Sequence, residues 1–418
     1  MPFVTLSFEL HQPRRLRHYT FFDIGRKHDY EDLESSRQMV GRLSEKCCLP
    51  ANALILELIR EHGGSFKVSY GISGLFLEQL RKSRKKVFDS FRRLADTGCV
   101  EFLGGTYHHS LAFLFAKKEF EDQVRLQCDL IEDLFGEAPV SFQNTGLIYN
   151  DDLARALEKI GFHAVLSEGA EKILQGRSPH VLYRPAGCRR IGVLLRNEHL
   201  SDDISFRFSD RTWSEYPLTA EKYAGWVHRV KGENTVVNVL VDYETFGGHQ
   251  WAETGIFEFL KALPREILKN PDFRFSTPAE VVRKVRPAGE LSVPDFISWT
   301  GKEKDLTAWC GNHLQKDALE ALYGLARRVR LKKDKRLTEV WRLLQASDHF
   351  YYMGNRWQEA ADLTRYLNPY PSPYDAYINF MNVLTDYSNV LKSGVPAIKK
   401  KKGGARPASP TGLRKPKK

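Results

Sequence analysis

The 418-residue sequence predicts an α/β protein in which a helix-covered parallel sheet is followed by a wholly helical part. Three observations support this. Short apolar runs rich in β-branched residues alternate with segments of helical periodicity over the first two thirds of the chain. About seven such units fit before Pro278, one fewer than a complete (β/α)8 barrel contains. Beyond Ser298 the periodicity is helical only.

The predicted strands are near-continuous apolar runs, as expected for parallel strands covered on both faces. They are Phe3–Leu10, Phe66–Ser73, Cys99–Gly105, His163–Gly169, Ile191–Arg196 and Val236–Glu244. The predicted helices between them are Leu54–Glu61, Leu75–Leu80, Val87–Asp96, Lys117–Phe135, Asp151–Ile160 and Trp251–Leu263. The C-terminal helices are predicted at Asp305–Val329, Leu337–Phe350, Trp357–Leu367 and Pro373–Leu391.

Charge and composition divide the chain into residues 1–290, residues 291–391 and a basic tail, 392–418. The tail holds ten Lys or Arg and no acidic residue, so the remaining chain has 53 basic against 52 acidic residues. Its Gly/Pro-rich composition predicts disorder. The net charge of +11 therefore does not predict a nucleic-acid-binding body, although the tail could contact RNA or anionic lipid weakly.

Several classes of protein are not expected. No apolar run reaches the roughly 18 residues of a membrane span, and the N-terminus lacks the pattern of a signal peptide. Six scattered cysteines without a CxxC pair favour buried thiols in a reducing cytoplasm, so we expect a cytoplasmic protein. We predict neither a metal nor any other cofactor.

Polar residues at strand ends are the candidates for a site, because the carboxyl ends of barrel strands carry active sites. His11 follows the first strand in ELHQP, where we interpret it as a sugar-binding residue. In GGTYHHSL (104–111), adjacent histidines of an extended segment point to opposite faces, and we expect His109 to face the pocket. A zinc site here lacks a third ligand at regular spacing.

Asp242 ends the most apolar strand, where burial could raise its pKa enough for general-acid catalysis. The alternative is a structural carboxylate. Further along, Trp299 and Trp309 offer aromatic faces for sugar rings, with core packing equally compatible with each. Asn312 and Gln315 offer amides for sugar hydroxyls.

Together, ELHQP, GGTYHHSL, NTGLIYND, HLSDDISFRFSD, VDYETFGGHQ, DLTAWCGNHLQ and LQASDHFYYM resemble glycoside hydrolase family 57, in its α-amylase-like branch. The resemblance covers residues 3–391. It implies an incomplete (β/α)7 barrel followed by a C-terminal helical bundle, and action on α-1,4-linked glucans with retention of configuration.

Residue by residue, the resemblance implies that His11 and His109 bind substrate and that Asp242 is the general acid/base. The position of the nucleophile glutamate is occupied by Gly146. Gly105 and Gly248 stand at two further positions where relatives carry glutamate. Loss of a nucleophile removes several powers of ten in rate. Glu168 is the best remaining carboxylate, although we expect it to position substrate or support structure.

Three hypotheses remain. The favoured one is an α-glucan or maltooligosaccharide binder with impaired or absent retaining hydrolysis. The second is an active α-amylase or 4-α-glucanotransferase-like enzyme that uses Asp242 with a relocated nucleophile or with water beside Gly146. The third is a non-catalytic interaction scaffold, which the presence of His11, His109 and Asp242 disfavours.

Overall fold

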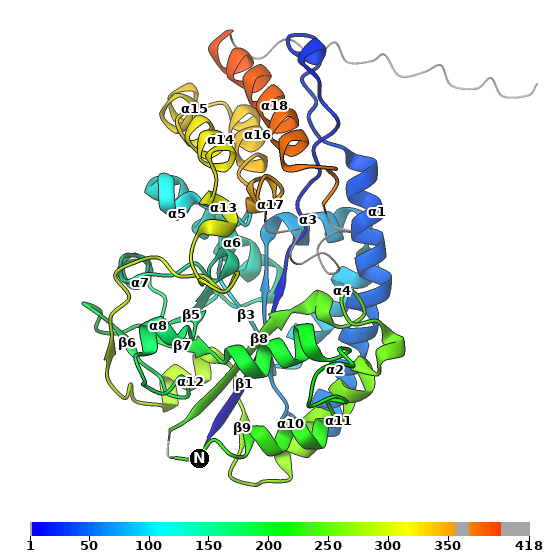
Figure 1. Cartoon of the computed structure of the whole chain (residues 1–418), viewed down its shortest axis with the longest axis vertical. Helices are drawn as coiled ribbons and strands as arrows, with labels where there is room; N and C mark the ends of the chain where they lie inside the picture. Colours follow the sequence, from blue (N-terminus) through cyan, green and yellow to red (C-terminus); the bar gives the residue numbers. More distant parts are fainter. Residues whose placement is uncertain (1, 233, 356–367, 394–418) are drawn as a thin grey trace, which may run out of the picture.

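The computed structural model describes residues 2–232, 234–355 and 368–393. Its upper half in Figure 1 is helical, and its lower half is built around a sheet of parallel strands. Within these ranges, no helix has both the length and the apolar character needed to cross a membrane. The predicted helix Trp357–Leu367 and the tail beyond Ser393 lie outside the described residues.

Seven parallel strands form the wall of the barrel, in the order β3-β2-β1-β8-β7-β5-β4. They are β1 (Phe3–Leu10), β2 (Val68–Ile72), β3 (Val100–Phe102), β4 (Ser141–Gln143), β5 (Ala164–Glu168), β7 (Gly192–Arg196) and β8 (Val236–Asp242). A short strand, β9 (Arg274–Phe275), pairs with the start of β1.

Two narrow contacts complete the ring of strands. Gly104, just beyond β3, bridges to Phe142 of β4, and its N–H donates to the Ser141 carbonyl at 2.8 Å. On the opposite side, β7 and β8 pair through Arg196 and Asn238 alone. The predicted α/β class and the incomplete (β/α)7 barrel are therefore confirmed.

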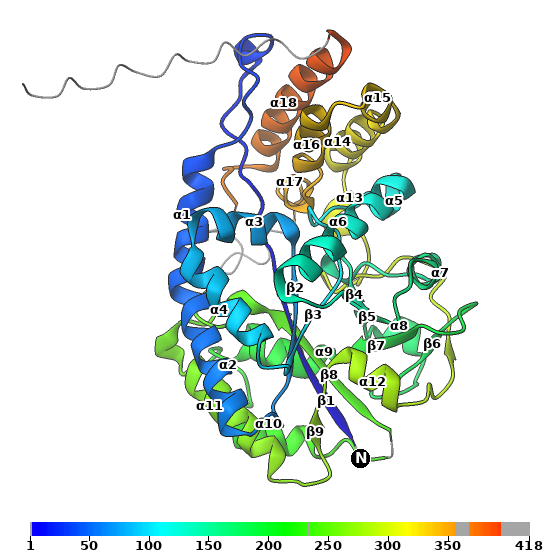
Figure 2. The ribbon, with the colours of Figure 1, turned by 180° about the vertical axis from the view of Figure 1, so that it is seen from behind.

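Helices surround this sheet, and Figure 2 shows α2, α4 and α11 along one side of it. The helices of the barrel part are α1 (Leu33–Leu43), α2 (Leu49–Glu61), α3 (Gly74–Ser83), α4 (Lys85–Ala95), α5 (Ala112–Phe115), α6 (Lys117–Phe135), α7 (Asp151–Ile160), α8 (Glu171–Leu174), α9 (Glu198–Asp202), α10 (Ala220–Val227), α11 (Ile256–Leu268) and α12 (Pro278–Lys284). The predictions for α6 and α7 match residue for residue, whereas α1, α10 and α12 were not predicted.

The C-terminal part is helical as predicted, but with more breaks. It contains α13 (Thr307–Cys310), α14 (His313–Tyr323), α15 (Ala326–Lys332), α16 (Lys335–Leu343), α17 (Ser347–Tyr351) and α18 (Pro373–Ser393). The single helix predicted over Asp305–Val329 was wrong, because Asn312 caps a new helix and accepts the N–H of Gln315 at 2.9 Å. The helix predicted over Leu337–Phe350 is likewise two helices, α16 and α17.

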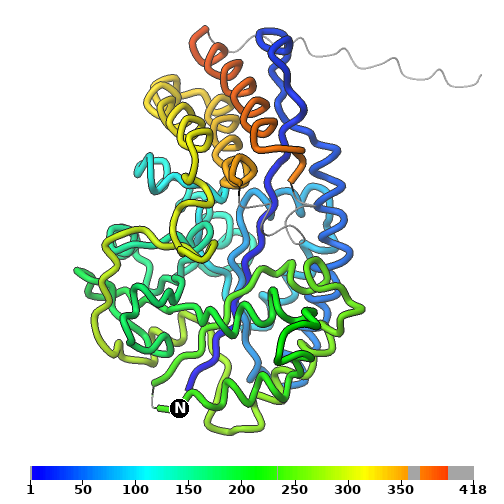
Figure 3. The backbone as a smooth tube through the Cα atoms, viewed as in Figure 1, coloured from blue at the N-terminus to red at the C-terminus, as the bar shows by residue number. Residues whose placement is uncertain are grey.

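The two parts share a hydrophobic core. One buried cluster joins barrel residues such as Phe142 and Val165 to bundle residues such as Trp341 and Tyr387. The predicted boundary at residue 290 falls in β10 (Glu290–Leu291), which pairs with β6 (Arg184–Pro185) of the barrel part. The helical part consequently lies directly over the carboxyl ends of the strands, as the backbone path in Figure 3 shows.

Candidate active site at the barrel mouth

The site begins at the end of β1, where the side chains of three polar residues form hydrogen bonds. The Glu9 Oε1 atom lies 2.7 Å from Nε2 of His109, which comes from the loop after β3. His11 contacts Ser73 through Nδ1 at 2.6 Å and Asp348 of α17 through Nε2 at 3.0 Å. The Gln12 amide donates to Glu244 at 2.7 Å. Barrel and bundle therefore meet through side chains at this mouth.

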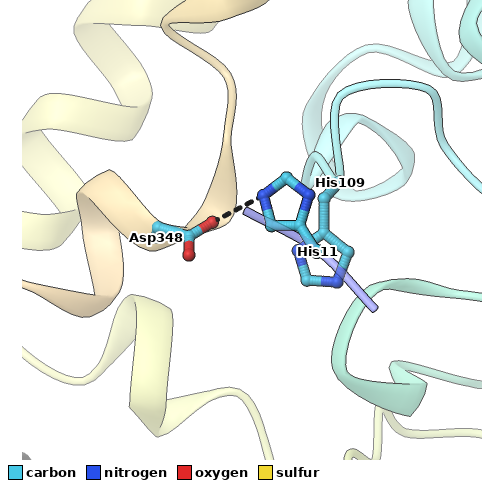
Figure 4. A group of neighbouring side chains, drawn as sticks. All are labelled: His11, His109 and Asp348. Atoms are coloured by element: carbon cyan, nitrogen blue, oxygen red, sulfur yellow. Dashed lines mark hydrogen bonds and ion pairs between the residues drawn. The ribbon is translucent and has the colours of Figure 1, made fainter. Parts of the chain in front are cut away.

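His11 and His109 stack face to face, with ring centroids 4.2 Å apart and planes inclined by 17°. Figure 4 shows this pair with Asp348 beside it. Among the described residues these three are the one group whose atoms lie close enough to share a metal ion. However, a ring nitrogen binds a metal ion in the plane of its ring, and the planes of these two stacked rings are nearly parallel. Their nitrogens are therefore poorly placed to bind the same ion. The arrangement favours hydrogen bonding over a shared ligand sphere.

The two histidines differ in how their surroundings shift their pKa values. Burial alone would lower the pKa of His109, but the hydrogen bond and charge of Glu9 outweigh it and raise that pKa. Burial, and then the charge of His109, lowers the pKa of His11. Burial alone would raise the pKa of Asp348, but His11 and His109 hold it well below its usual range. The pKa values of the two stacked rings therefore shift in opposite directions, which favours a proton on His109 over one on His11.

The His109 backbone is held in an uncommon conformation. Its φ of +52° lies in the left-handed region, which costs a residue with a Cβ roughly 1–2 kcal/mol. The His109 carbonyl accepts the N–H of Ser347 at 3.0 Å, and the ring Nδ1 lies 3.0 Å from the Ser347 hydroxyl. These contacts hold His109 at the hollow, while His108 is buried. The segment is a turn, not the extended strand that the sequence prediction assumed.

Asp242 lies at the end of β8, directly beside Glu9 in the β1–β8 register. Burial, then the negative charges of Glu9 and Glu244, raises the pKa of Asp242 well above its usual range. A protonated carboxyl at this position is what a general acid requires. Glu9 contributes to this shift from the adjacent strand, and its own Oε1 atom contacts His109.

Gly146 lies in the turn after β4 and contacts the bundle. Its φ is +55°, and a Cβ at this position would overlap the Trp309 ring, with Cζ2 at only 2.8 Å. Trp309, on α13, is 5% exposed and belongs to the shared core. The volume that a side chain at position 146 would need is therefore filled by an indole, and the prediction of an open aromatic face at Trp309 was wrong.

The other predicted contact residues mostly support structure. The Gln315 amide donates to the carbonyls of Ala308 and Phe350 and accepts from the N–H groups of Gly311 and Asn312, so it has no capacity left for a sugar. The Asn312 side chain caps α14 and donates to the Met353 carbonyl at 2.8 Å. These two assignments are corrected to helix capping and loop fixation.

Trp299 is half-buried and lies against a small cluster at the barrel centre. That cluster comprises Leu103, Leu147, Leu166 and Leu240. The Arg196 guanidinium lies 5.6 Å from the Trp299 ring centroid. Arg196 also forms a buried ion pair with Glu168 at 3.0 Å, which fixes the position of that carboxylate.

A small hollow opens between the ends of β1, β2, β3 and β4. Glu9, Gln127 and Gln143 line it, and each has a buried polar atom with no hydrogen-bond partner among the described residues. Such atoms are costly unless a ligand or water satisfies them.

Glycines leave room in this hollow. Gly105 lines it, and a Cβ there would lie 3.1 Å from the Gln143 carbonyl oxygen. Sequence reasoning missed Glu9, Gln143 and Asp348. Glu9 could have been found from the sequence, because it lies two residues before His11 and alternate residues of a strand share a face.

Comparison with known proteins decides the family. Residues 5–294 match the model described as "Glycosyl hydrolase family 57". The chain belongs to this family. It is 40% identical over 406 residues to the protein named "Putative alpha-amylase" from Methanocaldococcus jannaschii, covering 93% of this chain and 85% of that one.

Solved structures of this family share the fold. The chain is similar to a branching enzyme of glycosyl hydrolase family 57 from Pyrococcus horikoshii, with a TM-score of 0.69 and 16% identity over 93% of this chain and 90% of that one. It is also similar to a 4-α-glucanotransferase from Thermococcus litoralis, with a TM-score of 0.65 and 15% identity over 91% and 59%. The family assignment therefore places this chain in carbohydrate metabolism.

Gly146→Ala is expected to destabilise this family 57 protein more than Gly136→Ala. Both glycines have positive φ, but a Cβ at position 136 would meet nothing within 4 Å. The control should lose about 1–2 kcal/mol from backbone strain alone. Overlap with Trp309 should add about 1–3 kcal/mol at position 146. Urea denaturation measures both; equal losses would show that Trp309 does not restrict this position.

His109→Gln should change how stability depends on pH. A raised pKa means that protonated His109 stabilises the fold fully below about pH 6.5, the unfolded value, and that this contribution is lost as pH rises through the folded pKa. The melting-temperature advantage of the native protein should therefore shrink between about pH 6 and pH 9. His163→Gln controls for loss of an exposed histidine; a constant difference would contradict the Glu9–His109 ion pair.

Proposed function

We propose that this family 57 protein binds α-1,4-linked glucan at the barrel mouth. We further propose that position 146 supplies no nucleophile for hydrolysis with retention of configuration. The observation that carries the proposal is the contact of Gly146 with Trp309. A retaining glycosidase needs a nucleophilic carboxylate about 5–5.5 Å from its acid/base. At position 146 there is no carboxylate, and the surrounding volume is already packed.

The residues that line the hollow support glucan binding. Their unsatisfied amide and carboxylate atoms, on Gln127, Gln143 and Glu9, match the donors and acceptors of sugar hydroxyls. His109 and Ser73 line the same space. The names of the related proteins, an α-amylase, a branching enzyme and a 4-α-glucanotransferase, favour an α-glucan as the ligand.

Isothermal titration with maltoheptaose should show binding that Gln143→Ala weakens by about tenfold, because one amide hydrogen-bonding group contributes roughly 1–1.5 kcal/mol. Gln143 is 5% exposed and lines the hollow, whereas Gln38 is exposed on α1. Gln38→Ala is therefore the matched control and should bind as the native protein does. Absence of heat with maltodextrins of every length, or equal binding by both variants, would contradict the proposal.

A second candidate is hydrolysis with Glu9 as a relocated nucleophile. Glu9 and Asp242 are partners in the parallel β1–β8 ladder, whose strands lie about 4.8 Å apart, compatible with a retaining carboxyl pair. Glu9 Oε2 would attack the anomeric carbon while the glycosidic C–O bond breaks and protonated Asp242 gives its proton to the leaving oxygen. Asp242 would then take a proton from the water that displaces Glu9.

The contact with His109 argues for the binding function, because a hydrogen bond of 2.7 Å to Glu9 Oε1 reduces the nucleophilicity of that carboxylate. Native protein should therefore release no nitrophenol from p-nitrophenyl α-maltoside, and neither should Glu9→Gln. If the native protein is active and Glu9→Gln loses about a thousandfold or more while the exposed-site variant Glu258→Gln does not, the second candidate is correct.

A further inference from the structure

Two segments that are distant in sequence lie at the C-terminal end of α18. They are the loop Thr20–Lys27 and the corner between α15 and α16. Figures 1 and 2 both show the loop and α15 at the same end of the molecule as the end of α18. We refer to this region as the distal end. It lies at the far end of the bundle from the barrel.

The loop Thr20–Lys27 is fixed to α18 and presents two aromatic side chains to solvent. Buried Asp386 accepts the N–H of Gly25 at 2.6 Å and lies 2.7 Å from the Tyr30 hydroxyl. Above this anchor, Phe21 is 73% exposed and Phe22 is 78% exposed. A rigid loop that holds two adjacent phenylalanines in water is costly for the fold alone and indicates an apolar partner.

The corner between α15 and α16 carries concentrated positive charge. Seven of the ten residues from 327 to 336 are basic, and one, Asp334, is acidic. The basic residues are Arg327, Arg328, Arg330, Lys332, Lys333, Lys335 and Arg336. All seven are exposed, and none forms an ion pair within the described part of the chain. Among them Leu331 is 71% exposed.

A hydrogen bond links this corner to the same end of α18. The Tyr387 hydroxyl donates to the Leu337 carbonyl, at the start of α16, at 2.8 Å. Tyr387 follows the loop anchor Asp386 directly, and α18 ends at Ser393, about 10 Å further along the helix. The loop and the corner are therefore both attached to the C-terminal part of α18, between Asp386 and Ser393.

We propose that the distal end is a docking surface for an anionic lipid bilayer, to which the protein binds peripherally. Basic side chains near an anionic bilayer each contribute about 1 kcal/mol, and apolar side chains at the same surface enter the headgroup region. Phe21 and Phe22 on one side and Leu331 on the other supply those apolar groups. The barrel mouth at the other end of the bundle remains accessible to glucan.

A bilayer fits better than a single-stranded nucleic acid. Nucleic-acid binders pair positive charge with flat aromatic platforms on which bases stack. Here Phe21 and Phe22 lie edge to face, at 79°, and the apolar residue within the basic corner is aliphatic. The sequence from 392 to 418 contains no aromatic residue. These features provide no flat aromatic surface on which bases could stack. Phe and Leu side chains, by contrast, both partition into lipid.

Co-sedimentation of the full chain with vesicles tests the proposal. Vesicles of phosphatidylcholine mixed with phosphatidylglycerol should bind the protein, and pure phosphatidylcholine should not. Reversal of three corner charges, by Arg327→Glu, Arg328→Glu and Arg330→Glu, should weaken binding at least about tenfold. The matched control reverses three exposed charges on α4, by Lys86→Glu, Arg92→Glu and Arg93→Glu, and should retain most of the binding. Equal losses would reduce the effect to net charge and overturn the proposal.

The apolar contribution is tested separately with Phe21→Ser combined with Phe22→Ser. Both side chains are exposed, so the fold should persist, and circular dichroism verifies this. Binding to anionic vesicles should fall severalfold, while Trp251→Ser, which removes another exposed aromatic ring, should leave it unchanged. Tighter binding to polyuridylate than to vesicles, insensitive to the phenylalanine substitutions, would overturn the proposal in favour of a nucleic acid.

Discussion

The seating of the helical part on the barrel mouth is the constraint on which the site depends. Trp309 of α13 fills the volume beside Gly146, while Asp348 and Ser347 of α17 hold His11 and His109. Each of these contacts joins a strand end to a helix of the bundle. The same packing that orders the histidines therefore fills the space that a side chain at position 146 would need.

Electrostatics at the mouth follow from this packing. Carboxylates on both sides of the stacked histidines, Glu9 and Asp348, compensate for burying the rings. The pKa of His109 is raised and that of His11 is lowered, a difference that favours charge on one of the two stacked rings. Burial and the charges of Glu9 and Glu244 raise the pKa of Asp242. The site therefore combines a carboxyl group disposed to donate a proton with carboxylate and amide groups that line a small hollow, a set suited to hydroxyl recognition.

Local patterns predicted much of this molecule. Long periodic segments located α6 and α7, and the strand-end rule found His11, His109 and Asp242. The strand β4 was missed because three residues are too few to show a period. Asn312 and Gln315 form a capping box that the sequence displays, but we interpreted the amides as ligand contacts. Contacts such as His11–Asp348, separated by 337 residues, depend on tertiary packing that no local pattern encodes.

The central claim is that position 146 lacks both the carboxylate and the space for retaining hydrolysis. The most direct measurement compares release of nitrophenol from p-nitrophenyl α-maltoside by Trp309→Ala and by Trp309→Ala combined with Gly146→Glu. Without the ring, a glutamate side chain at position 146 has room, so the double variant should gain activity that the single variant lacks. Hydrolysis at ordinary rates by Trp309→Ala or by the native protein, with glycine at 146, would contradict the account.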